Sequence, residues 1–165
     1  MKDTGFLQDN ISVIESLKKL PIISSLEDRH IKGLVKLCKI IEYAPGERIF
    51  AEDGFDQHLY ILISGKVSVL KNGVEVSALT KPGDIFGEMG IIDAAARSAS
   101  VFAVDKVSCL KMDASFMDRL KGEEKQTVVC VVNKVFTEML SDRLRKTTEE
   151  FIKAKEELER LKKRG

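Results

Sequence analysis

Between Lys39 and Met112, turn signals of two residues divide the chain at intervals of roughly ten residues. The segments between these signals are short, rich in β-branched residues and often alternate between apolar and polar side chains. The signals are Pro45-Gly46, Asp53-Gly54, Ser64-Gly65, Asn72-Gly73 and Pro82-Gly83. Such even spacing is typical of antiparallel sheets and not of βαβ units. The pattern therefore predicts a mainly β protein, an antiparallel jelly-roll β-barrel with flanking helices.

The pair Asn72-Gly73 is the sharpest of these turn signals, because both residues tolerate a positive φ. Such a pair favours a type I′ turn, whose twist matches that of two paired antiparallel strands. We therefore expect a tight hairpin that joins a strand over residues 66–71 to a strand over residues 74–79.

Both ends of the chain show a helical period instead. From Ile11 to about Ile41, apolar residues recur three or four positions apart and Pro21 interrupts them, which predicts two amphipathic helices. From about Glu123, helix-forming residues run unbroken almost to the end of the chain. The sequence therefore predicts one long C-terminal helix.

The expected C-terminal helix carries apolar or small side chains at alternating steps of four and three residues. This heptad seam consists of Leu140, Leu144, Thr147, Phe151, Ala154, Leu158 and Leu161. The flanking positions are charged, with many neighbours of opposite sign. Because one helix cannot bury such a seam alone, we expect a parallel two-stranded coiled coil and a homodimer. The alternative is that the helix folds back on its own barrel.

Composition argues against several classes of protein. The 27 basic and 26 acidic residues give a formal net charge of +1, so no general electrostatic grip on nucleic acid is expected. Cys38, Cys109 and Cys130 form no CxxC pair, and with only His30 and His58 beside them no metal site is expected. Scattered cysteines fit reduced, buried thiols. With no apolar signal segment and no membrane span, we expect a soluble, cytoplasmic protein.

The stretch from Phe86 to Val101 carries the chemistry. It sets Glu88 and Arg97 at the two ends of a short loop of otherwise glycine, alanine and mostly apolar residues. A carboxylate accepts from a sugar hydroxyl, and a guanidinium grips a phosphate with two parallel N–H groups. Small residues between them let backbone N–H groups approach the same ligand. The loop therefore predicts a site for one compact, singly charged nucleotide.

Four separated motifs occur in a fixed order: Tyr43-Ala44-Pro45-Gly46-Glu47, then Leu59 to Val67, then Pro82 to Met89, and last Arg97 to Val101. In this order and spacing, the segment from about Leu20 to Glu150 resembles the cyclic-nucleotide-binding domain family. This is the sensor module of the catabolite activator protein, of cyclic-nucleotide-dependent kinase regulatory subunits and of cyclic-nucleotide-gated channels. The resemblance implies a domain over residues 21–122, preceded by an N-terminal helical extension over 1–20 and followed by a dimerising helix over 123–165.

The resemblance also implies roles for single residues. Gly87, Glu88 and Met89 would belong to the phosphate-binding segment, with Glu88 on the ribose 2′-hydroxyl. Arg97 and Ser98 would bind the cyclic phosphate, together with backbone N–H groups in this segment and at Ala99. Several of these side chains have an alternative role without a ligand. Arg97 could be an ordinary surface arginine, and Glu88 could cap a nearby helix. Ser98 could bond its own backbone in a turn, and Met89 could fill the core.

The base has its own expected contacts. By the same resemblance, Val69 would lie on the apolar wall beside the base, and Thr147 and Thr148 would contact adenine across the dimer seam. Thr147 has an alternative as a polar seam residue that only sets register. Since Ser98 could also serve guanine, cyclic GMP remains an alternative to cyclic AMP.

These expectations combine into a function. We expect a stand-alone cyclic nucleotide sensor that prefers cyclic AMP, needs no cofactor and signals through its C-terminal helix to another protein. The chain ends at Gly165, too early for the winged helix-turn-helix of the bacterial regulators, so DNA binding is not expected. No His, Cys or second carboxylate is expected beside Glu88, which argues against an enzyme. The alternatives are a structural or interaction module that has lost its ligand, and a haem sensor.

Overall fold

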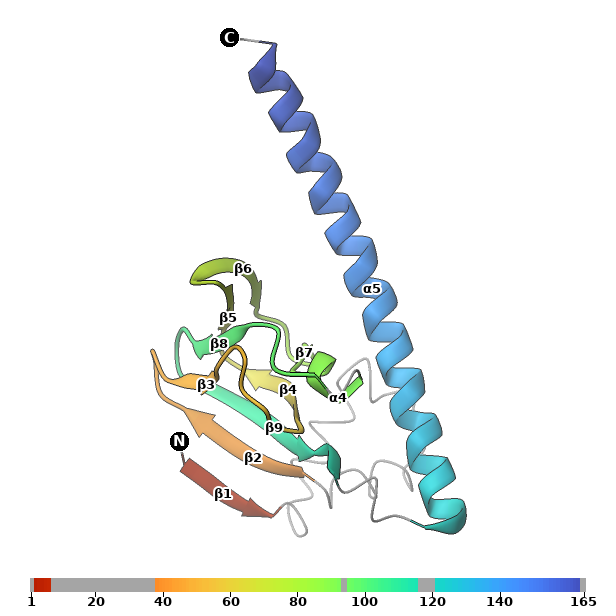
Figure 1. Ribbon diagram of the computed structural model, residues 1–165. Coiled ribbons are helices and arrows are strands. Elements are labelled where there is room, and N and C mark those ends of the chain that lie inside the picture. Colours follow the sequence, from red (N-terminus) through yellow and green to blue (C-terminus); the bar gives the residue numbers. More distant parts are fainter. Residues whose placement is uncertain (1, 7–37, 93–94, 116–120, 164–165) are drawn as a thin grey trace.

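A computed structural model describes residues 2–6, 38–92, 95–115 and 121–163 of the chain (Figure 1). The strands are β1 (Lys2–Phe6), β2 (Cys38–Tyr43), β3 (Arg48–Phe50), β4 (His58–Ser64), β5 (Val67–Lys71), β6 (Val74–Leu79), β7 (Ile85–Phe86), β8 (Ser100–Ala103) and β9 (Val107–Asp113). The helices are α4 (Met89–Ile92) and α5 (Gly122–Lys162). The predicted turn signals between Lys39 and Met112 all lie at or near strand ends, as the sequence indicated.

The strands form two antiparallel sheets. The order is β1-β2-β9-β4-β7 in a five-stranded sheet and β3-β8-β5-β6 in a four-stranded sheet. Strand β9 is the centre of the first sheet, and it pairs with β2 on one side and β4 on the other. The predicted mainly β architecture of antiparallel strands with a C-terminal helix is confirmed.

The hairpin of β5 and β6 confirms the strongest local prediction. Asn72 and Gly73 have φ values of 51° and 78°, so both adopt the left-handed region that a type I′ turn requires. The pairing register shifts once, because Val69 lies opposite Ser77 whereas Leu70 lies opposite Glu75. This bulge leaves one extra residue, Val76, in β6.

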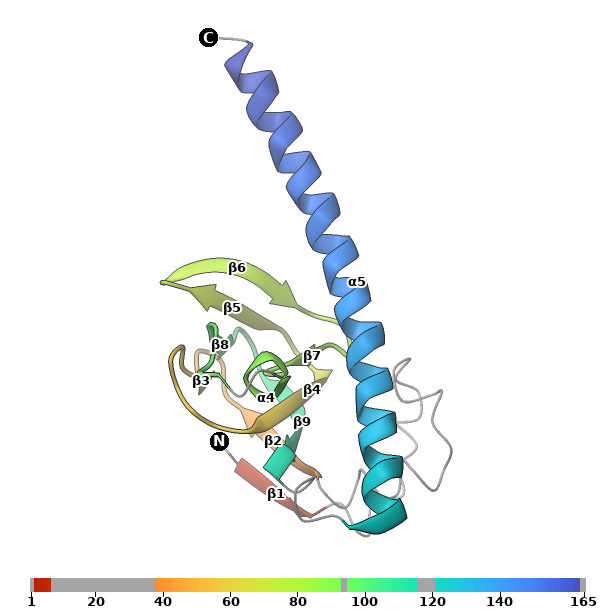
Figure 2. The same cartoon turned by 45° about the vertical axis from the view of Figure 1, so that its right-hand side comes forward.

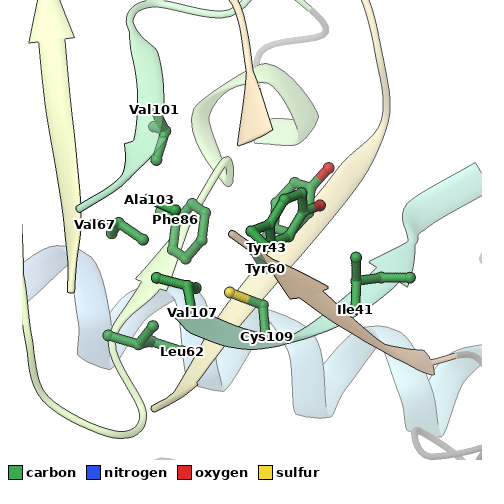
Figure 3. Packing of buried hydrophobic residues seen from close by; sticks show 10 residues of the cluster. All are labelled: Ile41, Tyr43, Tyr60, Leu62, Val67, Phe86, Val101, Ala103, Val107 and Cys109. Atoms are coloured by element: carbon green, nitrogen blue, oxygen red, sulfur yellow. The ribbon is translucent and has the colours of Figure 1, made fainter. Parts of the chain in front are cut away.

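The core lies between the two sheets. Val67 and Val101 come from the four-stranded sheet, Leu62 and Cys109 come from the five-stranded sheet, and all four point into the same interior (Figure 3). Each of these side chains is at most 1% exposed. Burial raises the pKa of Cys109 to about 12, so this thiol stays protonated.

The N-terminal part differs from the prediction in two ways. Residues 2–6 form strand β1 and not a helix, and they pair with β2. Cys38 to Ile41 belong to β2, so the predicted helical period extends too far along the chain. At Cys38 to Ile41 the ladder of backbone hydrogen bonds with β1 and β9 overrides the side-chain period. The remainder of the two predicted helices lies outside the described residues.

Helix α5 confirms the predicted long C-terminal helix. Its first part lies beside the barrel and its last part extends beyond it in both views (Figure 2). Val132 and Phe136 are buried, whereas Leu144 and Phe151 of the seam are 70% and 67% exposed. Cys130 is exposed, so the expectation that all three cysteines are buried is wrong for this one. Among the described residues, no helix combines the length and apolar character needed to span a membrane.

Gly65 provides a test of the barrel. Gly65 and Gly46 both have a positive φ, but only at Gly65 would a Cβ meet backbone, 2.5 Å from the carbonyl oxygen of Lys106. We expect Gly65→Ala to lower the free energy of unfolding by about 2–5 kcal/mol, from backbone strain plus overpacking. The control Gly46→Ala has open space and should lose about 1–2 kcal/mol. Urea unfolding measures both, and equal losses would contradict the steric argument.

Candidate functional site

A cavity of about 980 Å³ opens between the barrel and helix α5. Its walls come from the β5–β6 hairpin, from the segment that contains β7 and α4, from the segment before and into β8, and from α5. Its volume lies near the upper end of the range of small-molecule sites, about 300–1,000 Å³. Because it lies between the barrel and a helix, a ligand bound in it can contact both.

Most of the predicted site residues line this cavity. They are Val69, Gly87, Glu88, Met89, Arg97, Ser98, Ala99 and Thr147. Thr148 is not among the described residues that line it, and its hydroxyl donates to the backbone oxygen of Leu144 at 2.8 Å. The Thr148 hydroxyl is thus engaged with the backbone of its own helix. The predicted contact of Thr148 is therefore not supported within this chain.

Arg97 is turned inward, as predicted, and its side chain is only 2% exposed. Its Nε donates to Asp56 Oδ2 at 3.2 Å, and its Nη2 donates to the other carboxylate oxygen of Asp56 and, at 2.6 Å, to the carbonyl oxygen of His58. Its Nη1 donates to the carbonyl oxygen of Gly87. Its Cζ lies 4.3 Å from the centroid of the Phe50 ring. The guanidinium is thus fixed from several sides.

Asp56 is one of two residues of the candidate site that the sequence reasoning missed, and Arg143 is the other. Asp56 lies 41 positions before Arg97 in a loop between β3 and β4, and no local pattern marks it. A buried guanidinium needs a paired carboxylate, because an unpaired buried charge is strongly unfavourable. That requirement predicts some acidic partner for Arg97 but does not say which one.

Gly87 is required by the position of Arg97. Its φ is 81°, and a Cβ there would lie 2.8 Å from Arg97 Nη1 and 3.0 Å from the carbonyl oxygen of His58. Glycine therefore gives the guanidinium room to approach the backbone at the start of the loop.

Glu88 is as deeply buried as Arg97, at 1% exposure. Its carboxylate accepts from Nη1 of Arg143 on helix α5, and Nη2 of the same arginine donates to the backbone oxygen of Ile85 at 2.8 Å. Glu88, the residue predicted to bind the ribose, thus forms an ion pair that connects the barrel to the helix. Arg143 lies four positions before Thr147, on the same face of α5. This spacing is the one feature of the sequence from which Arg143 could have been predicted as a site residue.

Ser98 and Met89 lie at the open part of the cavity. Both are exposed, and the Ser98 hydroxyl lies 3.5 Å from the sulfur of Met89. The suggestion that Met89 fills the core is wrong, since 47% of it is exposed. A thioether is a weak acceptor, so this hydroxyl can readily donate to a ligand instead.

Burial and Arg97 act in opposite directions on Asp56. Burial alone raises the pKa of its carboxyl, but hydrogen bonds from Arg97 and from the backbone of His58, together with the charge of Arg97, outweigh burial. The pKa therefore lies below its ordinary value. Asp56 also accepts at 3.1 Å from Nδ1 of His58, when that nitrogen carries its proton.

The cavity can bind an anion, and its walls hold few groups for covalent chemistry. No His or Cys is among the described residues that line it. Carboxylates other than Glu88 line the same cavity: Asp84, Glu138, Asp142 and Glu150. Asp84 accepts backbone N–H groups of Thr80 and Lys81, and Asp142 lies 3.3 Å from Arg145. Asp84 and Asp142 thus already have partners.

The comparisons with known proteins agree with this geometry. The family model described as cyclic nucleotide-binding domain matches residues 40–124, which is more than half of the chain. The chain therefore belongs to the cyclic nucleotide-binding domain family. The antiparallel barrel with its C-terminal helix is the fold of this family.

Two relatives show how far the similarity extends. The chain is 34% identical over 107 residues to the cAMP-dependent protein kinase regulatory subunit of Aspergillus niger, which covers 64% of this chain and 26% of that protein. It is 26% identical over 137 residues to the CRP-like cAMP-activated global transcriptional regulator of Mycobacterium tuberculosis. The aligned region covers 81% of this chain and 59% of that regulator. The chain thus matches less than two thirds of either relative.

A solved structure supports the fold. The crystal structure of a cyclic nucleotide-binding domain from Methylobacillus flagellatus has a TM-score of 0.75 and 18% sequence identity, over 90% of this chain and 86% of that chain. This likeness confirms the arrangement of barrel and helix.

The pairing of Asp56 predicts a dependence on pH. Because the carboxyl pKa is lowered on folding, ionised Asp56 stabilises the folded state above its ordinary pKa, and this stabilisation is lost as the pH falls through the lowered value. Between about pH 6 and about pH 2.5, the free energy of unfolding should therefore fall less in Asp56→Asn than in the unchanged protein.

Urea unfolding at both pH values measures the difference. The control Asp142→Asn, which removes a carboxylate that is 67% exposed on α5, should keep the pH dependence of the unchanged protein. An equal fall in all three proteins would contradict the assigned role of Asp56.

Proposed function

We propose that this chain is a cyclic nucleotide sensor that prefers cyclic AMP and signals through helix α5. The observation that carries the proposal is the inward guanidinium of Arg97 at the wall of the cavity, with Glu88 also buried on that wall. A cyclic phosphodiester has one charge and no proton to lose near neutral pH, so a fixed cation in a shaped site suits it. Of the five N–H groups of Arg97, four donate to Asp56, His58 and Gly87, and the second on Nη1 has no acceptor among the described residues.

The remaining contacts follow the family resemblance. Glu88 accepts from the ribose 2′-hydroxyl, and Ser98 and the backbone N–H of Ala99 donate to the phosphate beside Arg97. Val69 on β5 and Thr147 on α5 lie on opposite walls of the cavity and contact the base. The names of the two relatives, one cAMP-dependent and one cAMP-activated, support cyclic AMP as the preferred ligand, with cyclic GMP as the alternative.

The signal follows from the ion pair of Glu88 and Arg143. A ribose hydroxyl that binds Glu88 engages the same carboxylate that holds Arg143 of the helix. The ligand therefore changes the relative stability of the arrangements of barrel and helix, and it can do so only by its differential affinity for them. The readout is the position or exposure of α5, which a partner protein recognises.

The proposed sensor is a homodimer without catalytic activity. The exposed seam of α5, which includes Leu144 and Phe151, supports a parallel coiled coil with a second copy of the chain. The lack of His and Cys among the described cavity-lining residues supports a binding protein over an enzyme. The stand-alone character, the lack of DNA binding and the cytoplasmic location stay predictions from the sequence.

Arg97→Ala tests the ligand site. In the proposed complex, the Arg97 guanidinium and the cyclic phosphate form a buried, hydrogen-bonded charge pair. Loss of one member of such a pair costs about 2–5 kcal/mol, so affinity for cyclic AMP should fall roughly thirtyfold to several thousandfold. Isothermal titration calorimetry measures it, and circular dichroism checks that the fold persists. The control Arg160→Ala removes an exposed arginine near the end of α5 and should bind as the unchanged chain does.

The unchanged protein decides between a sensor and a module that has lost its ligand. A ligand at 100 times its dissociation constant adds about 2.7 kcal/mol to the free energy of unfolding, which raises the melting temperature. No shift with cyclic AMP or cyclic GMP at about 1 mM, a concentration at which even weak binding registers, would overturn the proposed function.

Leu144→Asp tests the dimer. Burying a charged or polar group in an apolar seam costs at least about 2 kcal/mol, so the dimer should weaken roughly thirtyfold or more. Analytical ultracentrifugation over a range of concentrations measures the dissociation constant. The control Lys153→Asp alters an exposed position of the same helix outside the seam and should leave the dimer intact. If the unchanged chain sediments as a monomer, the coiled coil is refuted.

A further inference from the structure

The β5–β6 hairpin forms one wall of the cavity, and the barrel supports its first strand, β5, far more than its second, β6. In the four-stranded sheet, β6 is an edge strand that pairs with β5. Nearly all of β6 is exposed, including 58% of Val76. Both Val76 and Ser77 nevertheless line the cavity, as do residues of α5. The position of this wall therefore depends on what holds the far end of the hairpin.

One carboxylate holds that end. Glu52 Oε1 lies 2.5 Å from Nζ of Lys71, the last residue of β5, and Glu52 Oε2 accepts the backbone N–H of Asn72 at 3.0 Å. Only 17% of the Glu52 side chain is exposed. The hydrogen bonds from Lys71 and Asn72 hold the pKa of this carboxyl below its ordinary value, so it stays ionised. Glu52 thus fixes the turn of the hairpin from outside the hairpin.

The loop that carries Glu52 is the loop that holds Arg97. The Asp53 N–H donates to the Arg97 carbonyl oxygen at 2.9 Å, and the Arg97 N–H donates to the Gly54 carbonyl oxygen at 2.8 Å. Asp56 of the same loop binds the guanidinium. The N–H of Glu52 itself donates to Oγ of Ser100 in β8 at 2.9 Å. This loop, residues 51–56, therefore contacts the phosphate side of the cavity and the tip of the opposite wall.

We propose that Glu52 is a positioning residue that fixes the base-side wall of the cavity relative to Arg97. The inference rests on the proposed function and adds to it a residue that does not line the cavity. Without Glu52, the hairpin keeps its own turn but loses its connection to the loop of residues 51–56. The affinity for the base then falls, whereas the contacts of Glu88 with the ribose and of Arg97 with the phosphate persist.

The test compares two ligands. The probes are cyclic AMP and ribose 3′,5′-cyclic phosphate, which lacks the base. In Glu52→Ala, affinity for cyclic AMP should fall roughly five- to tenfold, the factor that matches the net contribution of one typical hydrogen bond. Affinity for the base-free probe should stay within about twofold or increase, since Lys71 is freed beside the cavity. Calorimetric titration of both probes gives the ratio of the two dissociation constants.

The matched control is Glu42→Ala. Glu42 also forms an ion pair with a lysine, 3.2 Å from Nζ of Lys106, but it lies on β2 in the other sheet and does not line the cavity. Its removal should leave the ratio unchanged. Hydrogen exchange of the ligand-free proteins adds a structural readout, in which amides of residues 70–78 should exchange faster in Glu52→Ala than in Glu42→Ala.

The possible outcomes distinguish a failure of the positioning role from a failure of the proposed function. Equal loss of affinity for both probes, or unchanged exchange in the hairpin, would overturn the positioning role of Glu52 and leave the sensor function standing. If the unchanged chain binds neither probe, the proposed function fails together with any role of Glu52 in it. The predicted change of ratio, with faster hairpin exchange in the same variant, supports both.

Discussion

The burial of Arg97 against the half-buried Asp56 is the constraint on which the site depends. A guanidinium that is 2% exposed is tolerated because carboxylate oxygens, two backbone carbonyls and the Phe50 ring surround it. These partners come from three separate segments, so the barrel must close before any of them meet. Gly87 belongs to this set as well, because a side chain there would occupy the space of the guanidinium. The setting of Arg97 is therefore a consequence of the whole fold and not of one loop.

The second buried charge, Glu88, connects that site to the rest of the molecule. Its partner Arg143 is 40% exposed and comes from a helix that contacts the barrel over only part of its length (Figures 1 and 2). Removal of one member of a buried pair leaves an uncompensated charge, so Glu88 favours arrangements that keep Arg143 within reach. In the proposed sensor, the barrel supplies one half of the site and the helix supplies the half whose position responds to a ligand.

The sequence predicted well what neighbouring residues decide. Asn72-Gly73 and the long run of helix formers act locally, and both the hairpin and α5 follow them. The prediction from the sequence failed where contacts between distant segments of the chain determine the structure. Asp56 and Arg143 lie 41 and 55 positions from their partners, and strand β1 pairs with the distant strand β2, which no side-chain period records. The family motifs supplied Glu88 and Arg97, since their types and spacing are specific; the binding roles of these residues stay predictions.

Thr147 connects the two proposed uses of the helix. It belongs to the exposed seam, together with Leu144 and Phe151, and it also lines the cavity, together with Arg143. Residues three and four apart share a helix face, so the seam and the cavity-lining stripe meet at this position. In the proposed dimer, a second helix packed on the seam would therefore lie at the edge of the cavity. A ligand that contacts Thr147 and a partner helix that packs beside it must then favour compatible positions of α5, which makes binding and dimer geometry linked equilibria.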